Sequence, residues 1–85
     1  MRDFGNGNFI YTKPSCGWCV KAKNLLKEKN LPFTELVLDG KNIDKHSMNQ
    51  DLGRNDLSTI PQIVLNGKFV PGGFTGLVRH FGDKK

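Results

Sequence analysis

The chain has 85 residues, of which 36% are hydrophobic and 25% are charged, and this composition predicts one small globular domain over residues 1–85. No apolar stretch approaches the length that spans a bilayer, and the polar Met1–Gly7 segment lacks the apolar run of a secretory signal, so we expect a cytoplasmic protein with no membrane partner. The formal net charge of +5 favours anionic partners, but no nucleic-acid-binding motif accompanies it, so we expect small acidic molecules and no nucleic acid.

The first half of the chain predicts a strand, a helix and a second strand. Residues Asn8–Thr12 are rich in β-forming side chains, and Pro14 follows as a natural end of the strand. From Cys16 to about Asn30 the apolar residues recur at helical spacing, and Phe33–Leu38 has the composition of another strand. Because the three elements fit within roughly thirty residues, they predict a βαβ unit with parallel strands and a right-handed crossover.

The second half predicts a helix, a β-hairpin and a final helix. A polar helix is expected over part of Asn42–Leu52. The short β runs Gln62–Leu65 and Lys68–Val70 are separated by Asn66-Gly67, which is a strong hairpin signal. The last helix is marked by apolar residues at i, i+3, i+4 and i+7, namely Phe74, Leu77, Val78 and Phe81. The order β-α-β-α-β-β-α predicts an α/β fold with a four-stranded mixed sheet flanked by helices on both sides.

The only two cysteines, Cys16 and Cys19, stand three positions apart where the first strand hands over to the first helix. A disulfide between residues this close constrains little of the unfolded chain. In a reducing compartment such a pair therefore indicates a catalytic or metal-binding role. The free N–H groups and dipole of a helix N-terminus stabilise a thiolate on Cys16, and Lys13 and Lys21 add positive charge. Cys19 lies one turn deeper, within reach of a disulfide, and is expected to be the resolving thiol.

A zinc site is the metal-binding alternative for this pair. Zinc needs four ligands, and besides the cysteines only His46 and His80 are soft candidates. Their separations match no common finger or ribbon pattern, so we expect no metal ion at this site. His46 is instead expected on an exposed helix face and His80 near the end of the last helix.

With these features the chain resembles the glutaredoxins, over about Phe9–Phe81. The resemblance is carried by three segments, namely Tyr11–Cys19 with its Cys-Gly-Trp-Cys motif, Thr59–Ile63, and Asn66–Lys68 followed by Pro71–Thr75. It implies the thioredoxin fold and a dithiol glutaredoxin activity. In that activity glutathione is the reductant, Cys16 is the nucleophile, Cys19 resolves, and the substrates are protein disulfides and glutathione mixed disulfides.

The resemblance also assigns residues to the binding of glutathione. Pro61 would be cis and would turn the backbone of Ile60 towards the extended ligand. Lys13 would meet the glycine carboxylate of glutathione. Trp18 would be half-exposed, where it would shield the cysteines and contact substrate.

The remaining glutathione contacts are implied at the start of the last helix. Gly72 and Gly73 permit positive φ and a close approach of the backbone, and they lead through Phe74 and Thr75 into a helix N-terminus. That terminus would hold the γ-glutamyl carboxylate. An acidic residue often follows the diglycine in the family, but here Thr75 stands in that region and cannot pair with the amino group of glutathione.

Two alternative functions stay open on the sequence. A thioredoxin-like electron donor, recharged by a flavin reductase, would share the fold and the cysteine pair. Some glutaredoxins bridge a [2Fe-2S] cluster between two subunits through the first cysteine and glutathione, more readily where proline is missing after that cysteine, and here Gly17 stands in its place. We otherwise expect a monomer whose partners are glutathione and disulfide-containing proteins, with ribonucleotide reductase as a family-based suggestion.

Overall fold

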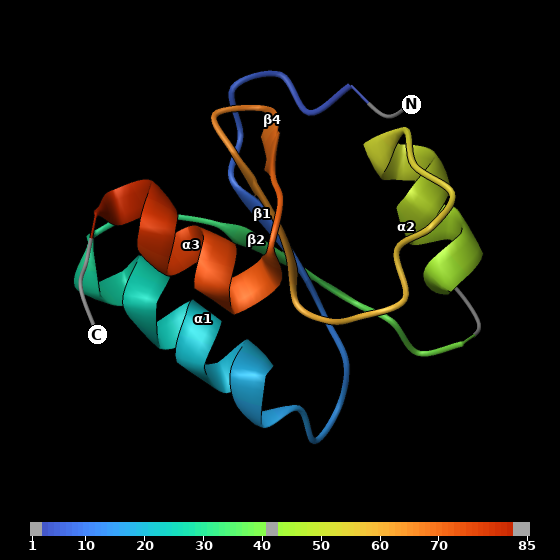
Figure 1. Ribbon diagram of the computed structural model, residues 1–85, viewed down its shortest axis with the longest axis horizontal. Helices are drawn as coiled ribbons and strands as arrows, with labels where there is room; N and C mark the ends of the chain where they lie inside the picture. Colours follow the sequence, from blue (N-terminus) through green and yellow to red (C-terminus); the bar gives the residue numbers. More distant parts are fainter. Residues whose placement is uncertain (1–2, 41–42, 83–85) are drawn as a thin grey trace.

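The computed structural model describes residues 3–40 and 43–82, and in them seven elements follow one another in the predicted order (Figure 1). They are β1 (Phe9–Thr12), α1 (Gly17–Glu28), β2 (Thr34–Val37), α2 (Lys45–Leu52), β3 (Gln62–Leu65), β4 (Lys68–Val70) and α3 (Gly73–Phe81). The order β-α-β-α-β-β-α is therefore confirmed.

The four strands form one mixed sheet in the order β2-β1-β3-β4. Strands β1 and β2 are parallel, as expected for the two strands that α1 connects, and Ile10 lies opposite Glu35. Strand β3 is antiparallel to both β1 and β4, with Ile63 as the partner of Ile10 on one side and of Val70 on the other. The predicted mixed sheet is thus confirmed, and β2 and β4 are its edges.

Helices cover both faces of the sheet (Figure 1). Because successive side chains of a strand point to opposite faces, Ile10 and Ile63 belong to the core under α1 and α3, whereas Tyr11 and Val64 belong to the core under α2. The first core contains Ile10, Ala22, Leu25, Leu26, Ile63, Leu65, Val70 and Leu77. The second contains Phe4, Tyr11, Met48, Leu52 and Val64.

The hairpin turn between β3 and β4 has the predicted Asn-Gly geometry. Asn66 and Gly67 both have positive φ, 53° and 76°, as a type I′ turn requires. The turn is tied to the N-terminal segment, because the Gly67 N–H donates to the Gly7 carbonyl at 2.9 Å. A Cβ atom on Gly67 would collide with the Gly5 carbonyl, so this turn tolerates only glycine at its second position.

Helix α1 ends earlier than the sequence predicts, whereas α2 lies within its predicted range. Helix α1 stops at Glu28, short of Asn30, because Asn30 takes a left-handed conformation (φ 59°) and the Leu31 N–H donates to the Leu26 carbonyl. This pattern is a Schellman end. Helix α2 runs from Lys45 to Leu52, as part of the predicted range, with Asp44 as its N-cap and Gly53, in the left-handed region, as its C-cap. Asn42 lies outside the described residues.

Within residues 3–40 and 43–82, no helix has both the length and the apolar character that a membrane crossing requires.

The Gly67 turn yields a test with a matched control. Gly67→Ala should lower the free energy of unfolding by about 2–4 kcal/mol. The alanine would have to adopt a left-handed conformation, and its Cβ would displace the Gly5 backbone. Gly5 also has positive φ (59°) but has open space where a Cβ would stand, so Gly5→Ala should lower it by only about 1 kcal/mol. Urea denaturation of the three proteins measures the difference. Equal losses for both variants would show that the Gly5 carbonyl does not restrict the side chain at position 67.

Candidate functional site

A sharp turn delivers Cys16 to the start of α1. The chain leaves β1, passes Pro14, and turns at Ser15, whose φ of 60° lies in the left-handed region. Cys16 then has extended backbone angles and is the N-cap of α1. Its sulfur accepts a hydrogen bond from the Cys19 N–H at 3.2 Å, the role that a Ser or Asp oxygen has in most helix caps. A negative sulfur at this position faces the positive end of the helix dipole, which stabilises a thiolate.

Cys19 lies one turn further along α1 and has a different environment. Both cysteines are free thiols, but Cys16 is partly exposed while Cys19 is only 2% exposed. Burial and the hydrogen bond with the Cys16 side chain raise the pKa of the Cys19 thiol to about 12. The pair therefore combines a partly exposed sulfur at a helix terminus with a buried thiol that stays protonated.

A pocket of about 420 Å³ lies beside the two sulfurs. Both cysteines line it, together with Lys13, Lys23 and Glu35. Lys13 thus lines the same pocket as Cys16, where its ammonium group can meet an anionic ligand. The other lysine expected to act on Cys16, Lys21, lies instead over the Trp18 ring, 4.5 Å from the ring centroid.

A small polar network forms the wall of this pocket. The Glu35 carboxylate accepts a hydrogen bond from the Thr12 hydroxyl at 2.6 Å and pairs with the Lys23 ammonium at 2.9 Å. The Thr12 hydrogen bond and then the Lys23 hydrogen bond hold the pKa of Glu35 below its usual range. Lys23 and Glu35 were not among the residues predicted for the site, although Lys23 stands four residues after Cys19 on the same helix face. Glu35 gives no local signal, since only the parallel pairing of β2 with β1 brings it here.

Most residues that the resemblance assigns to glutathione line a second pocket, of about 270 Å³. Its lining comprises Trp18, Thr59, Ile60, Pro61, Gly72, Gly73, Phe74 and Thr75. Lys13 and Cys16 line the first pocket rather than this one. The structure therefore brings together the predicted aromatic residue, the proline loop and the diglycine, and it places the predicted lysine with the cysteine.

Trp18 joins α1 to α3 at the second pocket. Its side chain is 57% exposed, and its ring lies 5.6 Å from the Phe74 ring. The bond between Ile60 and Pro61 is cis, as the resemblance implied. A Cβ atom on Gly73, which has positive φ (59°), would lie 3.0 Å from the Pro61 carbonyl oxygen, so glycine permits this close approach.

The N-terminus of α3 opens at the same pocket. Gly72 is the N-cap of α3 and supplies no side-chain hydrogen bond to the helix, and Thr75 is exposed in the first turn. Backbone N–H groups at such a terminus bind anions. The arrangement therefore suits a carboxylate at this end and a second carboxylate at Lys13.

The two histidines lie apart from the cysteines, on different helices: His46 is exposed on α2 and His80 is exposed near the end of α3. Among residues 3–40 and 43–82, no three or more His, Cys, Asp or Glu side chains are grouped as a metal site would need.

Comparison with known proteins identifies the family. The family model described as Glutaredoxin matches residues 8–70. Glutaredoxin 3 of Escherichia coli K12 is 38% identical over 63 residues, which cover 74% of this chain and 72% of that protein. The crystal structure of glutaredoxin 1 from Francisella tularensis, complexed with cacodylate, matches with a TM-score of 0.68 and 29% identity, covering 88% of this chain and 91% of that one. The chain belongs to the glutaredoxin family, a family of thiol–disulfide oxidoreductases with the thioredoxin fold.

A longer relative shows the same domain in another setting. The hybrid peroxiredoxin hyPrx5 of Haemophilus influenzae is 40% identical over 72 residues. These cover 85% of this chain, which spans 28% of that protein's length.

The contrast between the two sulfurs predicts selective alkylation. Near neutral pH the reduced protein should take up one equivalent of iodoacetamide, on Cys16, because a thiol with a pKa of about 12 forms almost no thiolate there. Modification of Cys19 should appear only as the pH rises towards that value. Mass spectrometry of proteolytic peptides locates the adduct, and protein unfolded in denaturant should react at both sites. Equal modification of both cysteines in the folded protein would contradict the assigned environments.

Proposed function

We propose that this protein is a glutathione-dependent thiol–disulfide oxidoreductase that reduces protein disulfides and glutathione mixed disulfides. The observation that carries the proposal is the unequal pair at the start of α1. Cys16 caps the helix and is accessible, whereas Cys19 is buried one turn away and hydrogen-bonded to it. An accessible thiolate is suited to attack a substrate, and a buried neighbour is suited to act only after the first exchange.

The proposed reaction follows from these two environments. The Cys16 thiolate attacks one sulfur of a protein disulfide; a Cys16–substrate mixed disulfide forms and the other substrate sulfur leaves as a thiolate. Cys19 loses its proton and attacks the Cys16 sulfur, which releases the second substrate thiol and leaves a Cys16–Cys19 disulfide. Two glutathione thiolates then reduce that disulfide in turn and become glutathione disulfide, so the substrate gains the two electrons that glutathione loses.

A glutathione mixed disulfide needs only one protein thiol. The Cys16 thiolate attacks the glutathione sulfur, a Cys16–glutathione mixed disulfide forms, and the substrate protein leaves as a thiolate. A second glutathione thiolate attacks that mixed disulfide, which frees Cys16 and forms glutathione disulfide. In this proposal the tripeptide extends between Lys13, for its glycine carboxylate, and the N-terminus of α3, for its γ-glutamyl carboxylate. Trp18 and the Ile60-Pro61 segment would flank its middle. Thr75 offers a hydroxyl and an N–H to the γ-glutamyl group, but no charge to its amino group.

The physiological setting stays a prediction from the sequence. We propose a cytoplasmic monomer whose partners are glutathione and disulfide-containing proteins, with ribonucleotide reductase as a family-based candidate.

The reductant is tested by measuring reduction of the oxidised protein with NADPH and either glutathione plus glutathione reductase or thioredoxin reductase. Reduction of the oxidised protein by thioredoxin reductase alone would favour the thioredoxin-like alternative. Colour and visible absorbance after anaerobic purification test the [2Fe-2S] alternative.

Single-cysteine variants test the roles of the two sulfurs. Cys16→Ser should abolish exchange with every substrate, because it removes the attacking thiolate. Cys19→Ser should keep the reduction of a glutathionylated peptide and lose most of the reduction of a protein disulfide, which needs the second thiol. The coupled oxidation of NADPH by glutathione reductase measures both reactions. An active Cys16→Ser protein beside an inactive Cys19→Ser protein would reverse the assignment.

Lys13 provides a test of where glutathione binds. Lys13→Ala should raise the KM for a glutathionylated peptide several-fold, since an exposed ion pair contributes up to about 1 kcal/mol. Alkylation of Cys16 should keep its rate within about twofold, because the helix terminus is intact. Lys68→Ala, on the edge strand β4, is the matched loss of charge and should leave KM unchanged. If Lys13→Ala and Lys68→Ala have the same KM, the glycine carboxylate does not bind at Lys13.

A further inference from the structure

One wall of the second pocket is the end of a segment without helix or strand. The chain leaves α2 at Gly53 and reaches β3 only at Gln62. The last residues of this segment, Thr59, Ile60 and Pro61, line the pocket. Their position relative to Trp18 and α3 therefore depends on whatever holds this segment in place.

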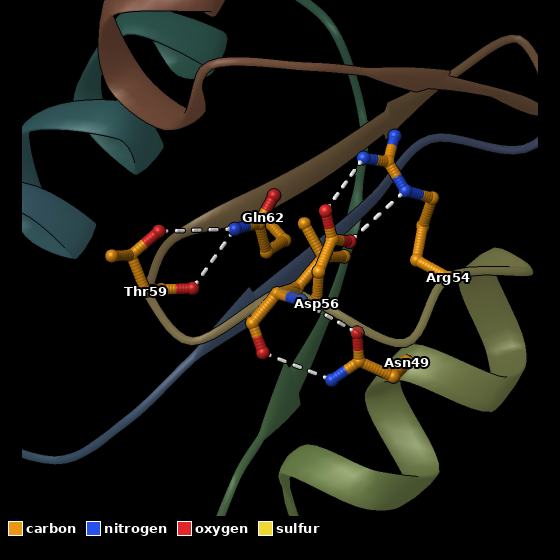
Figure 2. Close-up of polar contacts among 6 residues, drawn as sticks. Asn49, Arg54, Asp56, Thr59 and Gln62 are labelled. Carbon is orange, nitrogen blue, oxygen red and sulfur yellow. Dashed lines mark hydrogen bonds and ion pairs between the residues drawn. The ribbon is translucent and has the colours of Figure 1, made fainter.

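The Asn49 side chain, on α2, makes the most extensive contact to this segment. Its amide oxygen accepts the Leu57 N–H at 2.8 Å, and its amide nitrogen donates to the Leu57 carbonyl at 2.9 Å (Figure 2). The same nitrogen also donates to the Lys45 carbonyl within α2, at 2.8 Å. One amide thus satisfies both backbone groups of Leu57, much as a neighbouring strand would. Both bonds to Leu57 are partly buried, so water replaces them poorly.

The other polar contacts in Figure 2 differ in how strongly they hold the segment in place. Arg54 and Asp56 form an ion pair at 3.2 Å whose side chains are 43% and 63% exposed, and such pairs stabilise little. The Gln62 amide nitrogen donates to the Thr59 carbonyl at 2.9 Å and to its hydroxyl at 3.3 Å, which fixes the end of the segment that joins β3. Among the described residues, the Asn49 side chain therefore links the middle of the segment to helix α2.

Apolar packing continues the same connection. Leu57 and Ile60 are partly buried against the core that contains Met48 and Leu52 of α2. Met48 and Leu52 flank Asn49 in the sequence, so one helix supplies both the apolar and the polar contacts of the segment. A displacement of Leu57 would be passed to Ile60, three residues further on, which lines the pocket.

We propose that Asn49 is a positioning residue for glutathione binding, because its amide fixes Leu57 and so sets the Thr59–Pro61 wall of the pocket. This inference rests on the proposed function, since it concerns the same ligand. Asn49 touches neither the cysteines nor the pocket, and it acts on the ligand only through the segment. The role requires an amide. A carboxylate can accept from the Leu57 N–H but cannot donate to the Leu57 carbonyl, and alanine can do neither.

The test compares Asn49→Ala and Asn49→Asp with the wild-type protein and with Arg54→Ala, which removes the exposed ion pair from the same segment. The readouts are KM and kcat for a glutathionylated peptide, the alkylation rate of Cys16, and hydrogen exchange of the Leu57 amide by NMR. For Asn49→Ala we expect faster exchange at Leu57, a KM raised about three- to tenfold by the loss of partly buried hydrogen bonds, and unchanged alkylation. Asn49→Asp should fold, keep part of the Leu57 protection and raise KM to a smaller extent. Arg54→Ala should match the wild type in all three.

Each outcome separates the two proposals. If the Asn49 variants exchange faster at Leu57 but keep the wild-type KM, or if Leu57 exchange does not change in Asn49→Asp, the positioning role is wrong. A fall in kcat and in Cys16 alkylation at constant KM would overturn it as well, since that would place the effect at the cysteines. Should the wild-type protein itself fail to reduce the glutathionylated peptide, the proposed function fails, and the Leu57 exchange data then report only on the structural contact.

Discussion

The hydrogen bond from the Cys19 N–H to the Cys16 sulfur is the contact on which the organisation of the site depends. It makes Cys16 the N-cap of α1, so the sulfur replaces the oxygen that usually satisfies an N-terminal amide. A cap residue stands outside the helix and remains accessible. The residue three positions later lies inside the first turn, where it packs against the core. The bond therefore keeps Cys16 at the helix terminus, and the packing of α1 against the core buries Cys19.

That bond can set the position of Cys16 only because α1 is itself fixed. Its buried face, with Ala22, Leu25 and Leu26, packs on the sheet and beside α3, and the Schellman end at Asn30 stops the helix and turns the chain towards β2. Parallel pairing then places Glu35 beside Thr12 and within reach of Lys23. The cysteines thus lie at the junction of a helix terminus, the carboxyl end of β1 and a charged wall from β2.

The second pocket is formed by parts of the chain that are distant in sequence. Its walls are Trp18 of α1, the first turn of α3, and the segment that precedes β3, so three separate parts of the sequence must hold their relative positions. Two of these parts contact each other through the Trp18 and Phe74 rings, and Gly73 passes close to the Pro61 carbonyl. The third relies on α2, on the opposite face of the sheet (Figure 1). A helix on the other face of the sheet thereby helps to shape the second pocket.

The sequence by itself determined the elements and the chemistry that depend on local pattern. Asn66-Gly67 specified the hairpin, and the spacing from Phe74 to Phe81 specified the last helix. The strand-to-helix junction placed Cys16 and Cys19 at the start of α1. These signals are short-range, because turn geometry, helical periodicity and helix capping act between residues a few positions apart. The same locality explains the error at Asn30: periodicity continues to favour a helix there, while a single left-handed residue ends it.

Only the tertiary structure decided which of these residues share a surface. It placed Lys13 with Cys16 and not with Trp18 and Thr75, and it brought Glu35 beside the cysteines. It also buried Cys19 far enough to raise the pKa of its thiol to about 12. Each of these facts depends on strand register and on the packing of helices against the sheet, which join residues distant in the chain. No local pattern around Glu35 carries that information. The helical pattern around Cys19 indicates which face of the helix it lies on but not how fully it is buried, because burial and long-range contact are properties of the assembled core.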